Sequence, residues 1–211
     1  GLEFEREFLS KLKLLNVKII VFVHDVIPLM FKANGFLMQD YINLYNMADS
    51  IILPSEAMKE KLLQNGLNVK KIIFQRMWDH PHDLDLHEPK FKKEIYFAGN
   101  LSRFPELKTW EGTVPLTVFS NEEQLSLSNQ VHIAGWKTDE EMLLELSKGG
   151  FGLVWTTHQN EEQNIDYYSM NVSYKLSTYL AAGIPVIIPA TLSNSDFIVE
   201  QGLGFVVDNL E

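Results

Sequence analysis

Two cationic side chains, Arg103 and Lys175, have neighbours suited to binding an anion. Arg103 ends the segment 99–103, which follows a short apolar run, and its guanidinium has the planar fork that pairs with phosphate oxygens. Lys175 lies in the first turn of an expected helix, where a cation opposes the helix dipole unless an anion is near. A diphosphate between them would explain both. The alternatives are a β–α turn with a surface arginine and a solvated lysine.

The residues around Arg103 favour the same interpretation. Gly99 lets the backbone approach a ligand, and Asn100 and Ser102 supply neutral polar groups. Trp136, after a glycine, is a possible stacking platform for a base, although most tryptophans are core or partly buried residues. A single Gly-x-x-x-Arg motif is weak, so spacing alone leaves both interpretations open.

A metal site is the competing chemistry. Asp83-Leu84-Asp85 resembles the Asp-x-Asp that holds a divalent metal in one class of sugar transferases, and His80, His82 and His87 lie nearby. No apolar strand precedes the pair, and the spacing fits no tight ligand set. We therefore expect no metal ion, and a solvated hinge at this place.

Short apolar strands alternate with helices along the chain, which predicts an α/β fold with doubly wound parallel sheets. Ser55 is an expected N-cap, and Thr138 with Glu141 forms an expected capping box. A polar loop is expected at 156–170. The expected strands are 17–23, 51–53, 72–74, 94–98, 115–119, 131–134, 151–155, 185–188 and 204–207, and the expected helices are 2–15, 39–47, 55–66, 138–147, 173–182 and 196–201.

The alternation divides the chain into domains. Residues 1–77 hold three strands and begin in mid-pattern, so they form the C-terminal half of an N-terminal Rossmann-like domain. Residues 78–93 are polar, contain two prolines and lack periodicity, which indicates a linker. Residues 94–211 hold nearly a full set for a second Rossmann-like domain. The 211 residues, which open in an amphipathic helix without methionine, are expected to be a segment of a longer protein.

Composition excludes several classes of protein. The net charge of -10, from 18 basic and 28 acidic residues, argues against a general binder of duplex nucleic acid. The absence of cysteine excludes disulfides, thiolate zinc sites and cysteine nucleophiles. No apolar run approaches the roughly 20 residues of a membrane span.

Several phrases of the sequence resemble glycosyltransferases of the GT-B fold, in which two Rossmann-like domains face each other and the C-terminal one binds the sugar nucleotide. These phrases are 20–29, 48–56, 181–186 and 202–205. Four others are similar to the Gtf3-type glucosyltransferases of streptococci and lactobacilli, which glycosylate serine-rich repeat adhesins: 22–31, 75–81, 149–155 and 174–176. The resemblance implies a GT-B architecture whose N-terminal domain is incomplete in this chain.

The resemblance also implies an activity. It is the transfer of glucose from UDP-glucose to N-acetylglucosamine already linked to Ser or Thr of an adhesin. It implies a cytoplasmic bacterial homotetramer that retains anomeric configuration and needs no metal or cofactor, the UDP-sugar being a substrate. The alternatives are a galactofuranosyltransferase or other UDP-sugar transferase of the same fold, a non-catalytic subunit of a glycosylation complex, and a manganese-dependent enzyme built on Asp83 and Asp85.

Site residues follow from the same resemblance. Arg103 and Lys175 would hold the UDP diphosphate, and Trp136 would contact the nucleotide. Lining residues of the same pocket would be Asn100, Ser102 and Tyr174.

A glutamate pair that many GT-B enzymes carry, one of them on the ribose, is missing here. Its two positions are Thr178 and Met170. Thr178 is kept among the expected donor-binding residues without the glutamate's role. His24, at a strand end of the first domain, is the expected contact of the donor sugar, and no catalytic residue is assigned.

Overall fold

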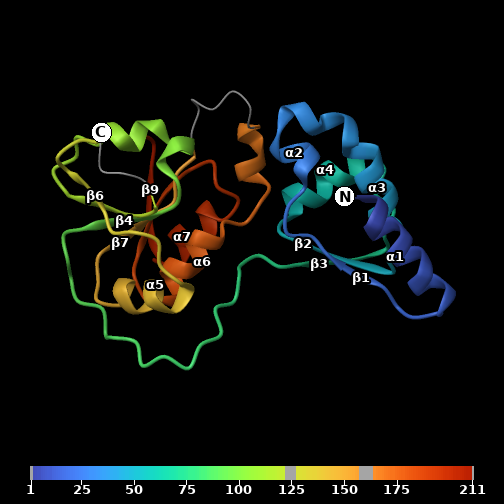
Figure 1. The fold of residues 1–211 in the computed structure, drawn as a ribbon, viewed down its shortest axis with the longest axis horizontal. Helices are drawn as coiled ribbons and strands as arrows, with labels where there is room; N and C mark the ends of the chain where they lie inside the picture. The colour runs from blue at the N-terminus through green and yellow to red at the C-terminus, as the bar shows by residue number, and fades with distance from the viewer. Residues whose placement is uncertain (1, 122–126, 157–163, 211) are drawn as a thin grey trace. The chain divides into compact units, whose positions relative to one another are not determined.

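The computed structural model describes residues 2–121, 127–156 and 164–210. The chain divides into two compact units (Figure 1). Unit 1 comprises residues 1–76 and 161–171, and unit 2 comprises residues 77–160 and 172–211. The chain therefore leaves unit 1, returns to it once, and ends in unit 2. Among the described residues, no helix has the length and apolar character needed to cross a membrane.

Unit 1 contains a three-stranded parallel sheet in the order β1-β2-β3. Its elements are α1 (Leu2–Leu14), β1 (Ile20–Phe22), α2 (Ile27–Met30), the 3-10 helix η1 (Lys32–Leu37), α3 (Met38–Tyr45), β2 (Ser50–Leu53), α4 (Glu56–Gln64), β3 (Lys71–Phe74) and the 3-10 helix η4 (Ile165–Ser169). The last of these comes from the second half of the sequence, yet it belongs to this unit.

The ends of α4 follow from two residues that the sequence places there. The Ser55 hydroxyl accepts a hydrogen bond from the Met58 amide at 3.1 Å, which satisfies one of the N–H groups left open at a helix start. Gly66 has φ +101°, the left-handed conformation that ends many helices. Both ends are confirmed as the sequence predicted them.

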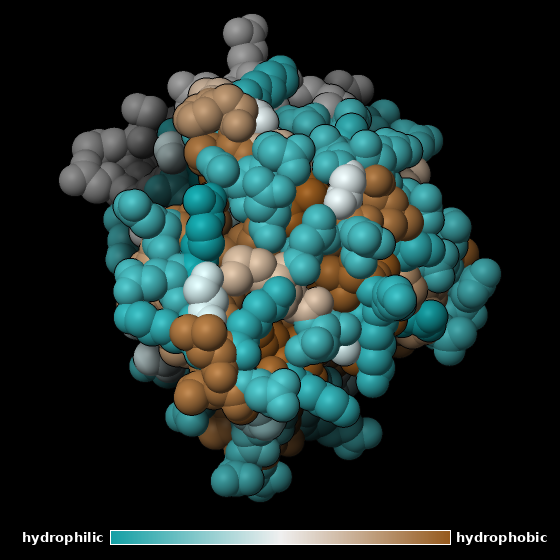
Figure 2. All heavy atoms as spheres, turned by 90° about the vertical axis from the view of Figure 1, so that its right-hand side faces the viewer, coloured by the Kyte–Doolittle hydropathy of each residue, from teal (hydrophilic) through white to brown (hydrophobic). Residues whose placement is uncertain are grey.

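One side of the sheet in unit 1 is more exposed than the other. Phe22, Ile52 and Ile73 lie opposite one another on this side, and Phe22 and Ile73 are each 41% exposed. On the other side, α3 and α4 bury Ile42 and Met58. On the face that Figure 2 draws, hydrophobic patches lie among hydrophilic residues. Within the described residues, one sheet face of this unit has no complete covering layer.

Unit 2 contains a six-stranded parallel sheet in the order β6-β5-β4-β7-β8-β9. This order reverses between β4 and β7, which is the doubly wound pattern of dinucleotide-binding domains. Its elements are β4 (Ile95–Ala98), the 3-10 helices η2 (Leu101–Arg103) and η3 (Pro105–Thr109), β5 (Leu116–Phe119), β6 (Val131–Ile133), α5 (Asp139–Leu146), β7 (Phe151–Leu153), α6 (Tyr174–Ala181), β8 (Val186–Pro189), α7 (Ser195–Glu200) and β9 (Gly204–Val207).

The core of unit 2 lies under η2 and η3. Phe97 and Leu153 of the sheet pack there with Leu101 and Leu107, and all four side chains are fully buried. Helix α5 begins where the sequence predicted a helix start. Its first turn has the predicted capping box, in which Thr138 and Glu141 exchange hydrogen bonds.

Three described segments differ from the sequence prediction. Residues 27–30 and 32–37 form α2 and η1, and residues 101–103 and 105–109 form η2 and η3, where the sequence pattern assigned no helix. Within the expected loop 156–170, residues 157–163 lie outside the described residues, and 165–169 form η4. These elements are too short to show hydrophobic periodicity, so the sequence pattern did not reveal them.

The expected linker, 78–93, contains no helix or strand and lies in unit 2. Hydrogen bonds nevertheless hold this segment against the rest of unit 2. The Trp78 amide donates to Ser177 Oγ at 2.9 Å, and the Trp78 indole N–H donates to the Val172 carbonyl at 3.1 Å. Further along, the His87 amide donates to Ser147 Oγ at 3.2 Å. These bonds attach the start and the middle of the segment to unit 2.

Candidate functional site

Helix α6 begins beside the carboxyl end of β4 because two contacts hold it there. Tyr179 of α6 is fully buried, and its hydroxyl accepts a hydrogen bond from the Ala98 amide at 2.8 Å. Gly152 of β7 makes room for the helix, since a Cβ at that position would lie 2.2 Å from the Tyr179 ring. The first turn of α6 therefore faces the loop that follows β4, at the point where strand order reverses and where ligands of such sheets bind.

Lys175 lies in this first turn of α6, beside two aromatic rings that contact each other. Its Nζ is 4.5 Å from the centre of Phe97 and 4.7 Å from that of Phe104. Loss of water around the ammonium group, and to a smaller extent the nearby Arg103, lower the pKa of Lys175 to about 7. The two rings attract the cation, but they do not outweigh these effects. The site thus holds two cationic groups that lie close enough for Arg103 to disfavour the charge on Lys175.

The loop after β4 supplies the second cation. Gly99 has φ +153°, and a Cβ there would lie 2.9 Å from Lys175 Nζ. Any other residue at position 99 would therefore displace the Lys175 side chain. The Asn100 side chain accepts from the Ser102 amide at 2.7 Å and starts η2. Ser102 and Arg103 are exposed on this short helix. The structure therefore brings Gly99, Arg103 and Lys175 together, as the diphosphate hypothesis requires.

Tyr174 and Thr178 are occupied by neighbours inside unit 2. The Tyr174 hydroxyl donates to Asp139 Oδ2 at 2.8 Å, and burial together with this bond raises the pKa of Tyr174 to about 12. Thr178 is only 2% exposed and donates to the Tyr174 carbonyl at 3.1 Å. The His80 ring lies 4.6 Å from the Tyr174 ring, and its Nε2 is 3.3 Å from Thr178 Oγ1. Burial lowers the pKa of His80, although Asp139 and Asp79 oppose this effect.

Trp136 follows β6 at the same edge of the sheet and is 65% exposed. Gly135 turns the chain there with φ +79°, and the Trp136 amide donates to Asn121 Oδ1 at 3.3 Å. The backbone is held while the indole faces solvent, which is the arrangement of a stacking surface rather than of a core residue.

Two polar residues of unit 1 lie at the carboxyl end of β1. His24 is exposed, and its ring is 4.6 Å from the Phe22 ring. Asp25 is exposed as well, and its carboxylate accepts hydrogen bonds from Tyr167 and Asn171. The sequence singled out His24 for the donor sugar. It gave no sign of the bonds to Asp25, because their partners lie more than 140 residues away.

Sequence reasoning also missed side chains in unit 2. His80 was weighed only as a metal ligand, and Phe97 and Phe104 were not connected with Lys175. In the described part of the chain, no group of three or more His, Cys, Asp or Glu side chains could hold a metal ion. A hollow of about 1030 Å³, between the segment 106–114 and the ends of β8 and β9, contains none of the predicted site residues.

A doubly wound parallel sheet of this kind occurs in glycosyltransferases of the GT-B fold, and the solved structures agree with this fold. Sucrose-phosphate synthase from Thermosynechococcus elongatus superposes with a TM-score of 0.59 and 13% identity, over 90% of this chain and 55% of its own. TarM superposes with a TM-score of 0.50 and 14% identity, over 92% of this chain and 41% of its own. The chain has the GT-B fold.

The family is shown by sequence. The profile described as "Glucosyltransferase 3-like, N-terminal domain" matches residues 1–77, and "Glucosyltransferase 3-like, C-terminal domain" matches residues 95–211. The chain belongs to this glucosyltransferase 3-like family.

Three curated proteins are similar to the chain in sequence. "Glucosyltransferase 3" of Streptococcus gordonii is 54% identical over 211 residues, which are 100% of this chain and 63% of the relative. The protein of the same name from Streptococcus parasanguinis is 43% identical, over 99% and 62%. "Beta-1,6-galactofuranosyltransferase WbbI" of Escherichia coli K12 is 25% identical, over 94% and 60%. The chain thus spans less than two thirds of the length of each of these relatives.

Proposed function

We propose that the protein transfers glucose from UDP-glucose to N-acetylglucosamine on Ser or Thr of a serine-rich repeat adhesin. The observation that carries the proposal is the placement of Lys175 Nζ against Gly99, close enough to Arg103 for the two charges to interact. Two cations at the switch point of a doubly wound sheet suit the diphosphate of a sugar nucleotide. Exposed Trp136 at the same edge offers a face for the base, and the exposed residues Asn100 and Ser102 supply polar groups.

The proposed mechanism needs no metal ion or cofactor. When the bond between sugar and diphosphate breaks, negative charge grows on the leaving UDP. Arg103 and Lys175 would stabilise that charge from fixed positions, which is the usual source of the largest rate effects in such reactions. We expect retention of anomeric configuration. We also expect activity to be unchanged by EDTA, whereas an enzyme built on Asp83 and Asp85 would lose it.

The test measures UDP released by the complete protein from UDP-glucose, with and without a peptide that carries N-acetylglucosamine. Release that depends on the peptide, and a gain of one hexose by mass, are expected. Binding of UDP by calorimetry without any transfer would favour a non-catalytic subunit of a glycosylation complex. No binding of UDP at all would contradict the donor site itself.

The sugar and the assembly are further parts of the proposal. The names of the two streptococcal relatives favour glucose, and the name of the Escherichia coli relative makes galactofuranose the alternative. Competition between UDP-glucose and UDP-galactofuranose in the same assay separates them. We further propose a cytoplasmic homotetramer, which light scattering on the purified protein and fractionation of the bacterial cells would test.

Gly99→Ala is expected to weaken UDP binding about tenfold, because the new methyl group displaces Lys175 Nζ and costs one charge-assisted hydrogen bond. Calorimetry with UDP measures the effect, and a thermal melt shows whether the variant folds. Gly35→Ala is the matched control, since a Cβ at that position meets no atom within 4 Å. A Gly99→Ala variant with unchanged UDP affinity would show that the position of Lys175 is unimportant for binding.

A further inference from the structure

The carboxylate of Asp25 is fixed at the carboxyl end of β1. Its Oδ1 accepts a hydrogen bond from the Tyr167 hydroxyl at 2.8 Å and a second from Asn171 Nδ2 at 3.0 Å. The residue is exposed, although its two partners hold it in one orientation. The end of a parallel strand is where α/β domains bind their ligands, so a fixed and accessible carboxylate there is well placed to take part in binding.

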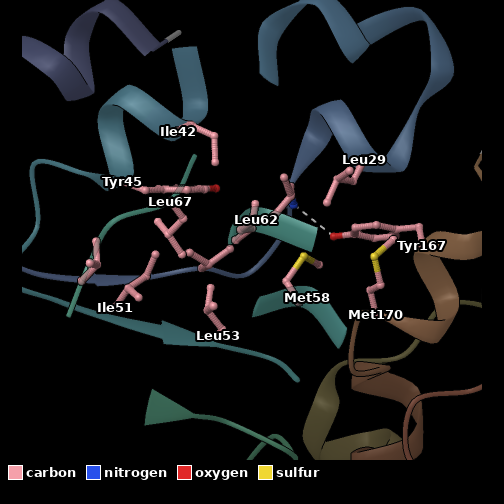
Figure 3. Packing of buried hydrophobic residues seen from close by; sticks show 13 residues of the cluster. Leu29, Ile42, Tyr45, Ile51, Leu53, Met58, Leu62, Leu67, Tyr167 and Met170 are labelled. Atoms are coloured by element: carbon pink, nitrogen blue, oxygen red, sulfur yellow. Dashed lines mark hydrogen bonds between the residues drawn. The ribbon is translucent and has the colours of Figure 1, made fainter. Parts of the chain in front are cut away.

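Tyr167 is itself held rigidly (Figure 3). Its side chain is 4% exposed and packs between Leu29 and Met170, and its oxygen accepts from the Val26 amide at 3.1 Å. Burial and the neighbouring Asp25 raise the pKa of Tyr167, so the phenol remains protonated and donates its hydrogen to the carboxylate. Asn171 Nδ2 also lies 3.1 Å from the Tyr167 oxygen, which closes the network.

This network occupies only one of the two oxygens of Asp25. Both bonds go to Oδ1, and within the described residues no donor is bonded to Oδ2. A neutral asparagine would anchor the segment around Tyr167 equally well, because its carbonyl oxygen accepts the same two bonds. A charged group is therefore not needed for anchoring. The second oxygen of a carboxylate is a strong acceptor for the hydroxyl of a carbohydrate.

We infer that Asp25 binds a hydroxyl group of the sugar acceptor through Oδ2, with Tyr167 and Asn171 as positioning residues. The inference rests on the proposed function, since it assigns the acceptor of that transfer to a carboxylate of unit 1. In this arrangement the acceptor hydroxyl donates its hydrogen to the Asp25 carboxylate, and this hydrogen bond orients the acceptor sugar.

Asp25→Asn in the complete protein is the test, because it keeps Oδ1 as an acceptor and removes only the charge. We expect the acceptor KM to rise at least about tenfold, as for a lost hydrogen bond to a charged group. The KM for UDP-glucose and the Kd for UDP are expected to stay unchanged. Asp40→Asn is the control, since it removes an exposed carboxylate of the same unit, one paired with Arg6, and should leave all three constants unchanged.

The outcomes separate this inference from the proposed function. If the wild type transfers sugar and Asp25→Asn has an unchanged acceptor KM, the inference fails while the proposed function stands. A lower melting temperature with equal loss of acceptor and donor binding would show a purely structural role and overturn it too. If the wild type transfers nothing, saturation-transfer NMR with the methyl glycoside of N-acetylglucosamine, in the presence of UDP, still decides. Equal signals from wild type and Asp25→Asn would refute the contact.

Discussion

Lys175→Met is expected to weaken the binding of UDP about 100-fold while leaving the protein folded. The lysine would make charge-assisted hydrogen bonds to the diphosphate, and such bonds contribute about 1.5–3 kcal/mol. Methionine has a similar length and can pack against the apolar rings of Phe97 and Phe104, beside which the lysine lies now. Calorimetry with UDP measures the affinity, and circular dichroism measures the fold.

Two further variants sharpen this result. Arg103→Ala should weaken UDP binding to a similar extent, because it removes the other cation of the pair. Lys148→Met is the matched control: it removes a lysine of the same unit that pairs with Glu145, and it should not change UDP affinity. If Lys175→Met binds UDP as tightly as the wild type does, the diphosphate lies elsewhere.

The lowered pKa of Lys175 makes a separate prediction for stability. In the folded protein this pKa is about 7, whereas an unperturbed lysine titrates near 10.5. Between these values the unfolded chain binds more protons than the folded one, so this group makes the free energy of unfolding rise with pH from about 7 to 10.5. Below pH 7 both states hold the proton and the full penalty remains. Urea melts of wild type and Lys175→Met across this range should converge as pH rises, and a constant difference would contradict the assignment.

Residues 1–77 made alone are expected to remain unfolded, although a family profile ends at residue 77. Unit 1 buries Tyr167 and Met170, at 4% and 6% exposure, in the cluster that contains Met58. Without them the core has a cavity, and the loss of each large buried side chain costs about 2–5 kcal/mol. Two such losses approach the total stability of a small domain, about 5–15 kcal/mol. Thermal melts and NMR spectra of the fragment measure the result.

The matched experiment restores the missing segment. Residues 1–77 joined by a flexible Gly/Ser linker to residues 164–171 should regain a cooperative melt, because the segment returns Tyr167 and Met170 to the core. The same chain with both residues changed to alanine should not. A cooperative melt and a dispersed NMR spectrum from residues 1–77 alone would show that the segment is dispensable for this unit.

The sequence predicted those parts of the fold that depend on local pattern. The strands among the described residues have apolar runs, α4 has a cap at Ser55, and α5 has the Thr138–Glu141 box, so each could be placed from neighbouring residues. Segment 165–169 is largely polar and too short for periodicity, and its burial depends on a return to unit 1 that no local signal encodes.

The candidate site also contains residues that the sequence could propose and residues that it could not. The sequence could propose Arg103 because it follows an apolar run and a glycine, and Lys175 because a cation opposes the dipole at a helix start. The rings of Phe97 and Phe104, which lower the exposure of Lys175 to water, could not be predicted. They are ordinary core residues in sequence, and only the packing of α6 against β4 brings the lysine to them.

The return of the chain to unit 1 also affects how the protein is made. Domains usually fold one after another as they leave the ribosome, at about 5–20 residues per second. The core of unit 1 is not complete until residue 171 has been synthesised, roughly ninety residues after the unit's first part ends. For about 5–20 seconds the nascent first part of unit 1 therefore exposes an unfinished core, which is the kind of surface that aggregates unless it is protected during translation.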